Sequence, residues 1–452
     1  MPYIGRAPTS TATKLEDADQ DTKIQVEESS DEDTIRFDIA GAEDFTMSAN
    51  SLNVLTGSVL ALPDGAVATP SITNTGDLNT GVYFPAADTV GVTAGGTEQF
   101  RFGSNPIPGG GKNLVINGAV NVSQRGVNAV ILAGFDSTTN TYGPDRFVMS
   151  GGATPQNRGE IEHVSSGGPT GFPSFFRYDV TTAEAAMASD EYTSIQTRLE
   201  GYITNRLSWG NAAAKDVTLS FYMRSPKTGT HNVAIGQSGG RYKIKEFTVA
   251  SADTWEKHSV TFSGDASGSM NAGNTEGLRI HWPIIAGSTY QGAADTWIAG
   301  GPWLRTSGGT QNLADNTSNN IDLTGVQLEI GSVATDFAHE DYGTTLQKCQ
   351  RYYARWEGAS KWGLSGVCRS TTGGVLGGFD FPVEMRAAPT ITYTTVNVID
   401  GSAGGVDGTL STGGVTTKSA TCSLGSSSGL TDGNGLFVEL KASGVIAASA
   451  EL

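Results

Sequence analysis

The clearest pattern along the chain is a short-range alternation of apolar and polar positions. Every second position between 217 and 224 is apolar: Val217, Leu219, Phe221 and Met223. This period predicts a strand that buries one face. Further strands are expected at 114–122, 242–249, 255–263, 278–285 and 321–330. Several such strands, separated by turns rich in Gly, Asn and Asp, predict a β-sandwich or jelly roll.

The first hundred residues carry a thinner version of the same pattern. Ile35, Phe37 and Ile39 alternate with polar neighbours, and residues 97–103 loosely echo residues 34–38. These features predict short strands in weak repeats. The apolar content is too low for a core within one chain, so the segment needs successive repeats or identical chains to cover its apolar face. The pattern therefore predicts an oligomer.

The composition changes after a Pro- and Gly-rich linker at 106–112, which combines a stiff and a flexible element. Residues 113–345 hold five of the seven tryptophans, which indicates a large core. Beyond residue 345, helical spacing in 346–356 competes with a strand beginning at Arg351, and both remain open. We therefore expect four parts: an N-terminal segment 1–20, a β-rich shaft 21–112, a jelly roll 113–345 and a C-terminal β domain 346–452.

Composition supports an all-β fold, because Gly makes up 60 of 452 residues and only 17% of residues are charged. The net charge of −17 argues against nucleic acid and against anionic membranes as partners. Residues 16–44 alone hold twelve acidic and two basic side chains, a net of −10. We expect no membrane insertion and no signal peptide, because neither an apolar run of 18 residues nor a basic start followed by an apolar stretch is present.

Catalytic and metal chemistry is poorly represented in the sequence. The five histidines form no metal-ligand spacing, and the Gly109–Lys112 segment lacks the spacing of a phosphate-binding loop. An oxygen-rich stretch at 315–322 is compatible with Ca²⁺, but a polar turn is the favoured interpretation. Paired carboxylates for glycoside hydrolysis cannot be chosen among 46 acids. We predict no catalytic residue, no metal and no cofactor.

Aromatic residues in Gly-rich loops are the remaining candidates for binding. They could stack on sugar rings. They could instead close the sandwich core or a subunit interface, and this second interpretation is favoured. The candidate glycan-binding residues are Tyr290, Trp297, Trp303, Trp356 and Trp362.

Several segments resemble known phage proteins. Residues 71–102, with the core Thr-Gly-Asp-Leu-Asn-Thr-Gly-Val-Tyr-Phe-Pro, resemble a segment that recurs in tail fibers of marine, podovirus-like bacteriophages. The first six residues resemble the N-terminal end of such fibers. Residues 113–118, 142–147, 323–331 and 349–353 resemble a jelly-roll module of phage fibers that is similar to carbohydrate-binding modules.

The resemblance implies a virion structural protein: an elongated homotrimeric tail fiber with a thin β shaft, assembled in the host cytoplasm. The N-terminus would anchor it to tail adaptor or nozzle proteins, and the distal domains would bind a host surface polysaccharide or protein. The implied anchor residues are Pro2, Tyr3, Ile4, Gly5 and Arg6. Because three copies of the acidic stretch would crowd charge, we expect those acids to face outward or to bind cations.

Two alternatives remain at this point. A tailspike-like glycan depolymerase ranks lower, because the sequence lacks the even ladder of 20–30 residues that a long β-helix needs. A capsid-attached fiber or decoration protein would have the same sequence features, since the difference lies in what the N-terminus docks onto.

Overall fold

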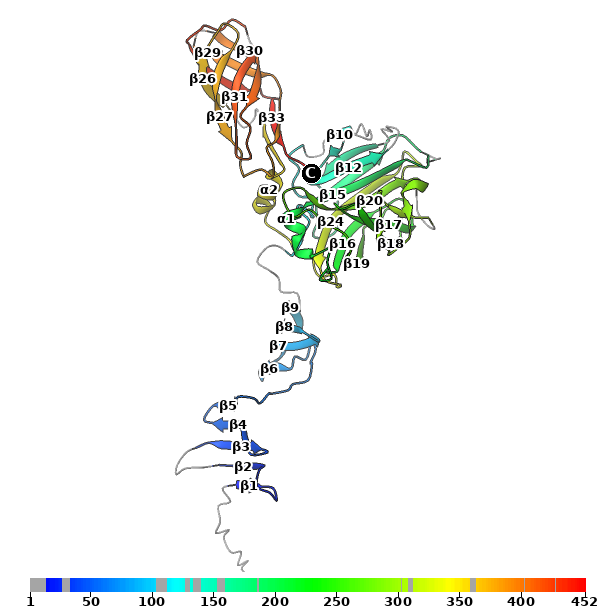
Figure 1. The fold of residues 1–452 in the computed structure, drawn as a ribbon, viewed down its shortest axis with the longest axis vertical. Helices are drawn as coiled ribbons and strands as arrows, with labels where there is room; N and C mark the ends of the chain where they lie inside the picture. Colours follow the sequence, from blue (N-terminus) through cyan, green and yellow to red (C-terminus); the bar gives the residue numbers. More distant parts are fainter. Residues whose placement is uncertain are drawn as a thin grey trace, which may run out of the picture. The chain divides into compact units, whose positions relative to one another are not determined.

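The computed structural model describes residues 14–26, 33–102, 112–126, 131–132, 140–152, 159–184, 187–301, 303–307, 312–357, 363–401, 403–426 and 428–452. About 50% of the chain is strand and 5% helix, which confirms the predicted all-β class. The chain forms two compact units, 1–106 and 107–452 (Figure 1). The division into four parts and the trimeric fiber stay predictions.

The N-terminal unit consists of two antiparallel meanders. The first sheet contains β1 (Lys14–Glu16), β2 (Lys23–Gln25), β3 (Ile35–Ile39), β4 (Ala42–Ser48) and β5 (Ser51–Val54). The second contains β6 (Ile72–Asn74), β7 (Asp77–Ala86), β8 (Thr89–Ala94) and β9 (Thr97–Phe102). Two-residue turns join β3 to β4, β4 to β5, β6 to β7, β7 to β8 and β8 to β9. Gly41, at φ +80°, sits in the β3–β4 turn, a conformation that costs glycine little.

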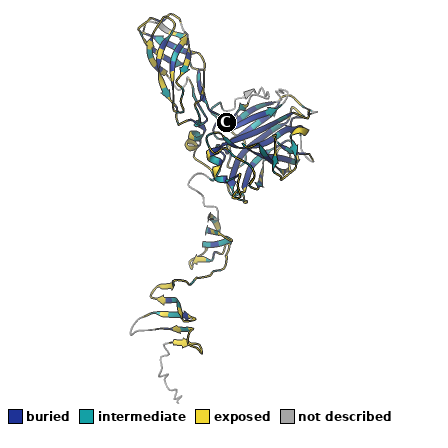
Figure 2. Cartoon of the chain, in the orientation of Figure 1, coloured by how far each residue is buried: buried dark blue, intermediate teal, exposed yellow. Residues whose placement is uncertain are grey.

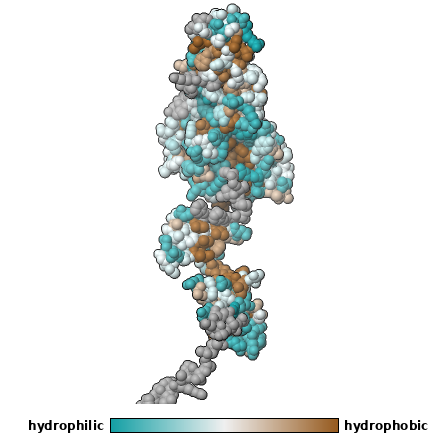
Figure 3. All heavy atoms as spheres, turned by 90° about the vertical axis from the view of Figure 1, so that its left-hand side faces the viewer, coloured by the Kyte–Doolittle hydropathy of each residue, from teal (hydrophilic) through white to brown (hydrophobic). Residues whose placement is uncertain are grey.

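The first sheet leaves an apolar face uncovered. Ile24, Phe37, Phe45 and Val54 lie directly opposite one another across four strands. Leu15 on β1 continues this row and is 70% exposed, and Leu52 in the neighbouring row is 54% exposed. The N-terminal strands are mostly exposed or intermediate in Figure 2, and hydrophobic atoms lie at the surface of this unit in Figure 3.

The second unit begins with a two-sheet sandwich. Its six-stranded sheet has the order β10 (Ile131–Leu132), β13 (Gly159–Val164), β14 (Phe175–Val180), β24 (Asn320–Ile330), β16 (Val217–Arg224) and β19 (Glu256–Phe262). Its seven-stranded sheet has the order β11 (Thr141–Tyr142), β12 (Phe147–Gly152), β15 (Tyr192–Glu200), β20 (Glu276–Ala286), β17 (Gly229–Gln237), β18 (Arg241–Val249) and β22 (Ile298–Ala299).

The sandwich core lies between these sheets and follows the alternation seen in the sequence. Phe221 of β16 packs edge-on against Trp282 of β20, with ring centroids 5.6 Å apart, and against Phe247 of β18 at 5.1 Å. Burial of each such side chain contributes about 1.5–3 kcal/mol. The apolar positions of 217–224 therefore face inward, as predicted.

The C-terminal part resolves the alternative left open for 346–356, because it contains both elements. Helix α2 (Tyr342–Gln350) begins where the Asp341 carboxylate accepts a hydrogen bond from Thr344 N at 3.0 Å, and β25 (Tyr353–Glu357) follows. β25 pairs with β33 (Val445–Ser449), which also pairs with β28 (Thr390–Tyr393).

A closed six-stranded barrel is formed by strands that lie between β25 and β33 in the chain. Its order is β26 (Gly363–Cys368), β27 (Gly374–Asp380), β31 (Ser419–Ser426), β30 (Ala403–Gly413), β29 (Val396–Asp400) and β32 (Gly435–Leu440). Closure leaves no unpaired strand edge. Cys349, Cys368 and Cys422 are free and buried. No helix among the described residues is long and apolar enough to cross a bilayer.

Ion pairs with buried partners connect the C-terminal residues to the sandwich. The Arg146 guanidinium lies 3.6 Å from the Tyr352 ring centroid and pairs with the Glu451 carboxylate. Arg351 donates to the buried Glu200 carboxylate at 2.6 Å. Beside these ion pairs, burial raises the pKa of Asp145 to about 6. Contacts of this kind fix the C-terminal strands against β12 and β15.

Candidate functional site

The outer face of the seven-stranded sheet carries an unusual row of polar side chains. Strand alternation turns Ile195 and Ile280 into the core, so their neighbours in sequence face outward. The register places Gln196 opposite His281 and Arg198 opposite Arg279. We call Ser194, Gln196, Arg198 and His281 the polar row.

The polar row is a continuous hydrogen-bonded chain. The Ser194 hydroxyl lies 3.3 Å from His281 Nδ1 and accepts from Gln196 Nε2 at 3.0 Å. Gln196 Oε1 in turn accepts from Arg198 Nε at 3.2 Å. Arg198 ends the chain by donating to Asn140 Oδ1 at 2.9 Å and to the Leu452 carbonyl at 2.6 Å. Buried polar groups cost free energy unless they are hydrogen-bonded, which explains the continuity of the row.

One buried atom of the polar row has no hydrogen-bond partner among the described residues. His281 is 1% exposed, yet its Nε2 has no hydrogen-bond partner among the described residues. Burial, reinforced by the positive charges of Arg279 and Arg198, holds the pKa of His281 well below its usual value. The imidazole is therefore neutral at pH 7 and offers an uncharged hydrogen-bonding atom.

Two tyrosines border the row, and glycines make room for them. A Cβ added at Gly152 would lie 2.2 Å from Tyr192 Cε1, and one added at Gly236 would lie 2.2 Å from Tyr242 Cε1. The Tyr242 ring lies 5.9 Å from the His281 ring. Burial raises the pKa of Tyr242, so its hydroxyl stays protonated and can donate.

The segment 290–306 lies along the same face. It contains the short parallel pair β21 (Gln291–Gly292) and β23 (Arg305–Thr306). Thr306 N donates to Asn232 Oδ1 at 3.3 Å, and the Thr306 hydroxyl donates to Glu246 Oε1 at 2.5 Å. These bonds hold the segment against the outward side chains of β17 and β18.

Two of the predicted aromatic residues lie in this segment at the outer face. The Tyr290 ring, on η2 (Ser288–Tyr290), packs edge-on against the Tyr192 ring at 4.7 Å. Trp303 lies beside Gly292, where an added Cβ would be 3.6 Å from Trp303 Cβ and 3.3 Å from Ile244 Cδ1. Both aromatic side chains are partly exposed.

The other predicted aromatic residues lie elsewhere. Trp297 Nε1 donates to the Ser263 carbonyl at 3.1 Å, and its ring packs against Trp209 at 5.1 Å, so it closes an edge of the sandwich. Trp356 packs against Phe379 at 5.2 Å in the C-terminal part. Trp362 and the predicted anchor Pro2–Arg6 lie outside the described residues. A glycan-binding role stays a prediction for all five aromatic residues.

The carboxylates at the outer face are already engaged. Glu276 accepts from Arg279 Nε at 2.5 Å and lies 3.7 Å from Arg198 Nε, while Glu246 accepts from Thr306. Each has a partner that ties it in place. The geometry suits binding of a polar molecule better than hydrolysis by a carboxylate pair.

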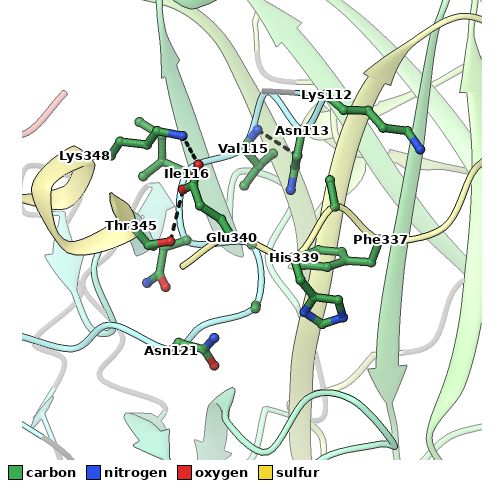
Figure 4. Close-up of a pocket in the computed structure, with 14 residues that line it drawn as sticks. Lys112, Asn113, Val115, Ile116, Asn121, Phe337, His339, Glu340, Thr345 and Lys348 are labelled. Atoms are coloured by element: carbon green, nitrogen blue, oxygen red, sulfur yellow. Dashed lines mark hydrogen bonds and ion pairs between the residues drawn. The ribbon is translucent and has the colours of Figure 1, made fainter. Parts of the chain in front are cut away.

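Apart from the outer face, a hollow of about 160 Å³ lies between residues 112–121 and 337–348 (Figure 4). Glu340 lies between Lys348 and Thr345 in this view and bonds with both. Asn113 Nδ2 donates to the Val326 carbonyl at 2.9 Å. These polar groups hold neighbouring segments together, which makes the hollow a weaker candidate than the outer face.

An exposed acidic cluster, Asp17, Asp19 and Asp21, lies in the β1–β2 turn. Its oxygens could approach a cation, but exposed acids are common without one. A backbone hydrogen bond from Thr22 lowers the pKa of Asp17. We assign no metal to this cluster.

Comparison with known proteins finds no matching protein family and no matching curated protein. Among solved structures, the enzymatically active domain of bacteriophage CBA120 tailspike protein 4 matches at TM-score 0.26 and 9% identity, over 49% of this chain and 22% of that one. A putative sugar-binding protein from Bacteroides thetaiotaomicron matches at TM-score 0.28 and 12% identity, over 48% and 100%. A family 11 carbohydrate-binding module from Clostridium thermocellum, in complex with a mixed-linked tetrasaccharide, matches at TM-score 0.23 and 12% identity, over 44% and 96%. Similarity at these TM-scores carries no functional argument.

Proposed function

We propose that this chain is a non-enzymatic bacteriophage tail fiber that binds a host surface glycan through the outer face of the seven-stranded sheet. The observation that carries the glycan site is the polar row, with the unpartnered Nε2 of His281. Native proteins seldom bury an unpaired polar atom, and a bound polar molecule would satisfy it.

The chemistry of a sugar matches what this face offers. Sugars present hydroxyl groups, which both donate and accept, and apolar ring faces that stack on aromatic side chains. The polar row offers His281 Nε2, which has no partner among the described residues, and the mutual hydrogen bonds of the row hold the His281 ring in place. Tyr290 and Trp303 supply aromatic rings beside it. Prealigned groups lose little entropy when a ligand binds.

The fiber part of the proposal rests on the N-terminal unit and on the sequence resemblance. The row from Leu15 to Val54 is exposed in one chain, and two further copies of the chain would cover it. The protein would then be a homotrimer within the virion, assembled in the host cytoplasm. Its N-terminus would dock onto tail adaptor or nozzle proteins.

The test combines assembly and binding on the full-length chain. Light scattering is expected to give about 141 kDa, three times the chain mass of 47.0 kDa. The purified protein should be retained on surface polysaccharide from a susceptible bacterial host and should release no reducing sugar from it. A monomer overturns the fiber, and release of sugar overturns the non-enzymatic function in favour of a depolymerase.

A further inference from the structure

Arg305 is a cation without a counter-ion in the part of the chain that the structure describes. It lies on β23 at the outer face of the seven-stranded sheet and is half-buried. Among the described residues its guanidinium has no ion pair, and its Nε has no hydrogen-bond partner. Burial alone lowers the pKa of Arg305, which agrees with the lack of a nearby acid. A half-buried charge left unpaired destabilises the fold unless something else pairs with it.

Two further unpaired donors belong to the same region. Asn232 is 4% exposed, and its Nδ2 has no partner among the described residues, although its Oδ1 accepts from Thr306 N. Trp303 Nε1 is also buried without a described partner. Asn232 and Arg305 line one small cavity of about 10 Å³. All three groups are donors, and the two that line the cavity need an acceptor as partner.

The balance of charge on the face points the same way. Arg198 and Arg279 share the Glu276 carboxylate, and Glu246 is engaged by Thr306. A hydrogen bond from a neutral hydroxyl leaves the Glu246 charge in place, so the three arginines and two glutamates named here sum to one positive charge, although the whole chain carries a net charge of −17. In so acidic a protein, an uncompensated cation beside unpaired donors indicates a site for a negatively charged group.

We propose that the glycan bound at this face is acidic, and that its carboxylate or ester sulfate pairs with the half-buried Arg305 guanidinium. This inference rests on the proposed glycan-binding function and names its substrate class. A neutral sugar would leave Arg305 without its charge partner.

The first experiment compares polymers that differ only in charge. Calorimetry on the full-length protein would compare dextran sulfate with dextran, and polygalacturonate with its methyl ester. We expect the charged member of at least one pair to bind about tenfold tighter or more, because hydrogen bonds to charged groups are strong. The pair that responds identifies the anion as sulfate or carboxylate.

Variants connect that preference to the residue. Arg305→Gln should remove the tenfold preference, and Arg305→Lys should keep part of it. Lys257→Gln is the matched control, since it removes the same charge from the exposed part of β19 on the other sheet. Because Arg305 has no described partner in the free protein, Arg305→Gln should leave the melting temperature unchanged or raised.

The outcomes separate this inference from the function on which it rests. Equal binding of charged and neutral polymers keeps the glycan-binding function and overturns the acidic substrate class. The same inference fails if Arg305→Gln keeps full preference, which would mean that an ordered water satisfies the cavity. A marked fall in melting temperature for Arg305→Gln would assign Arg305 a structural role instead. Binding of none of the four polymers counts against both proposals.

Discussion

Two sheets of this molecule invert the usual relation between polarity and exposure, in opposite directions. The five-stranded sheet of the N-terminal unit exposes much of its apolar row, including Leu15 and Ile24, while Gln25 and Asp38 are buried. The seven-stranded sheet buries the polar row on its outer face. A mismatch of either kind marks a surface that the single chain leaves incomplete. Exposed apolar rows call for protein, whereas buried polar atoms without partners call for a polar ligand.

The largest expected effect is loss of the trimer, and it tests the apolar row of the five-stranded sheet. Ile24→Glu would place a charge in the middle of the apolar row, where three copies are proposed to meet. Burial of an unpaired carboxylate costs several kcal/mol per copy, so the trimer should not form. Light scattering should then report about 47 kDa, the mass of one chain.

The control for this variant introduces the same charge on the opposite face of the sheet. Asn53 is exposed and lies beside Val54 on β5, pointing the other way. Asn53→Glu should leave the trimer intact. If Ile24→Glu also leaves it intact, the apolar row is not the contact surface.

The second prediction breaks the polar row. Arg198→Met would leave Gln196 Oε1, Asn140 Oδ1 and the Leu452 carbonyl without their common donor. Removal of one member of a buried charged network costs about 3–5 kcal/mol, measured as a fall in the free energy of unfolding in urea.

A nearby arginine provides the comparison. Arg279→Met removes the same charge, but the Arg279 side chain is 32% exposed and pairs chiefly with Glu276. Its loss should cost about 1 kcal/mol or less. Equal costs for the two variants would mean that the polar row is not a network that depends on Arg198.

The strands were more predictable from sequence than the site, but the strand predicted at 114–122 is wrong, because Asn117 and Val120 adopt positive φ there and the segment forms turns. The alternation at 217–224 fixes which side chains of β16 face inward, because a strand has only two faces. β15 (Tyr192–Glu200) was not among the predicted strands, and its alternation of apolar and polar residues could not have indicated that the polar face is buried. That burial depends on β20, Asn140 and Leu452, which are distant in sequence.

The loop aromatics illustrate the same limit. Trp297 and Trp303 lie six positions apart in one Gly-rich segment, and their sequence surroundings are alike. One closes the sandwich edge against Trp209, and the other lies at the outer face beside Ile244. A loop has no regular period, so nothing in the sequence assigns a side to either residue. Arg305 was missed for a related reason, since only the fold reveals that it lacks a counter-ion.

The third prediction compares carboxylates of the two units. A hydrogen bond lowers the pKa of exposed Asp17, whereas burial raises the pKa of Asp145 to about 6. A raised pKa means that the folded state holds the proton more tightly than the unfolded chain does. Asp145 therefore contributes stability that is fully present below about pH 4 and is lost as the pH rises through about 6.

Urea titrations between pH 4 and pH 7 can isolate this contribution. The wild type should lose about 2–3 kcal/mol relative to Asp145→Asn over that interval, since one pKa unit corresponds to about 1.4 kcal/mol. Taking the difference between the two proteins cancels the titration of the N-terminal acids, which both share. A constant difference across the interval would show that Asp145 stays ionised in the folded protein.

The smallest expected effect is a loss of glycan affinity without a change of fold. It tests the aromatic residues beside the polar row of the seven-stranded sheet. Tyr290→Ala and Trp303→Ala should each weaken binding of the retained host polysaccharide about tenfold, or about 1.4 kcal/mol, through loss of stacking area. Tyr202→Ala is the control, because Tyr202 is an equally large side chain, exposed on α1 (Gly201–Thr204). Affinity electrophoresis with immobilised polysaccharide measures all three. If the Tyr202 variant weakens binding as much as the other two, the site lies elsewhere. If only the Tyr290 and Trp303 variants weaken it, the buried polar row and these two partly exposed aromatic residues form one binding surface.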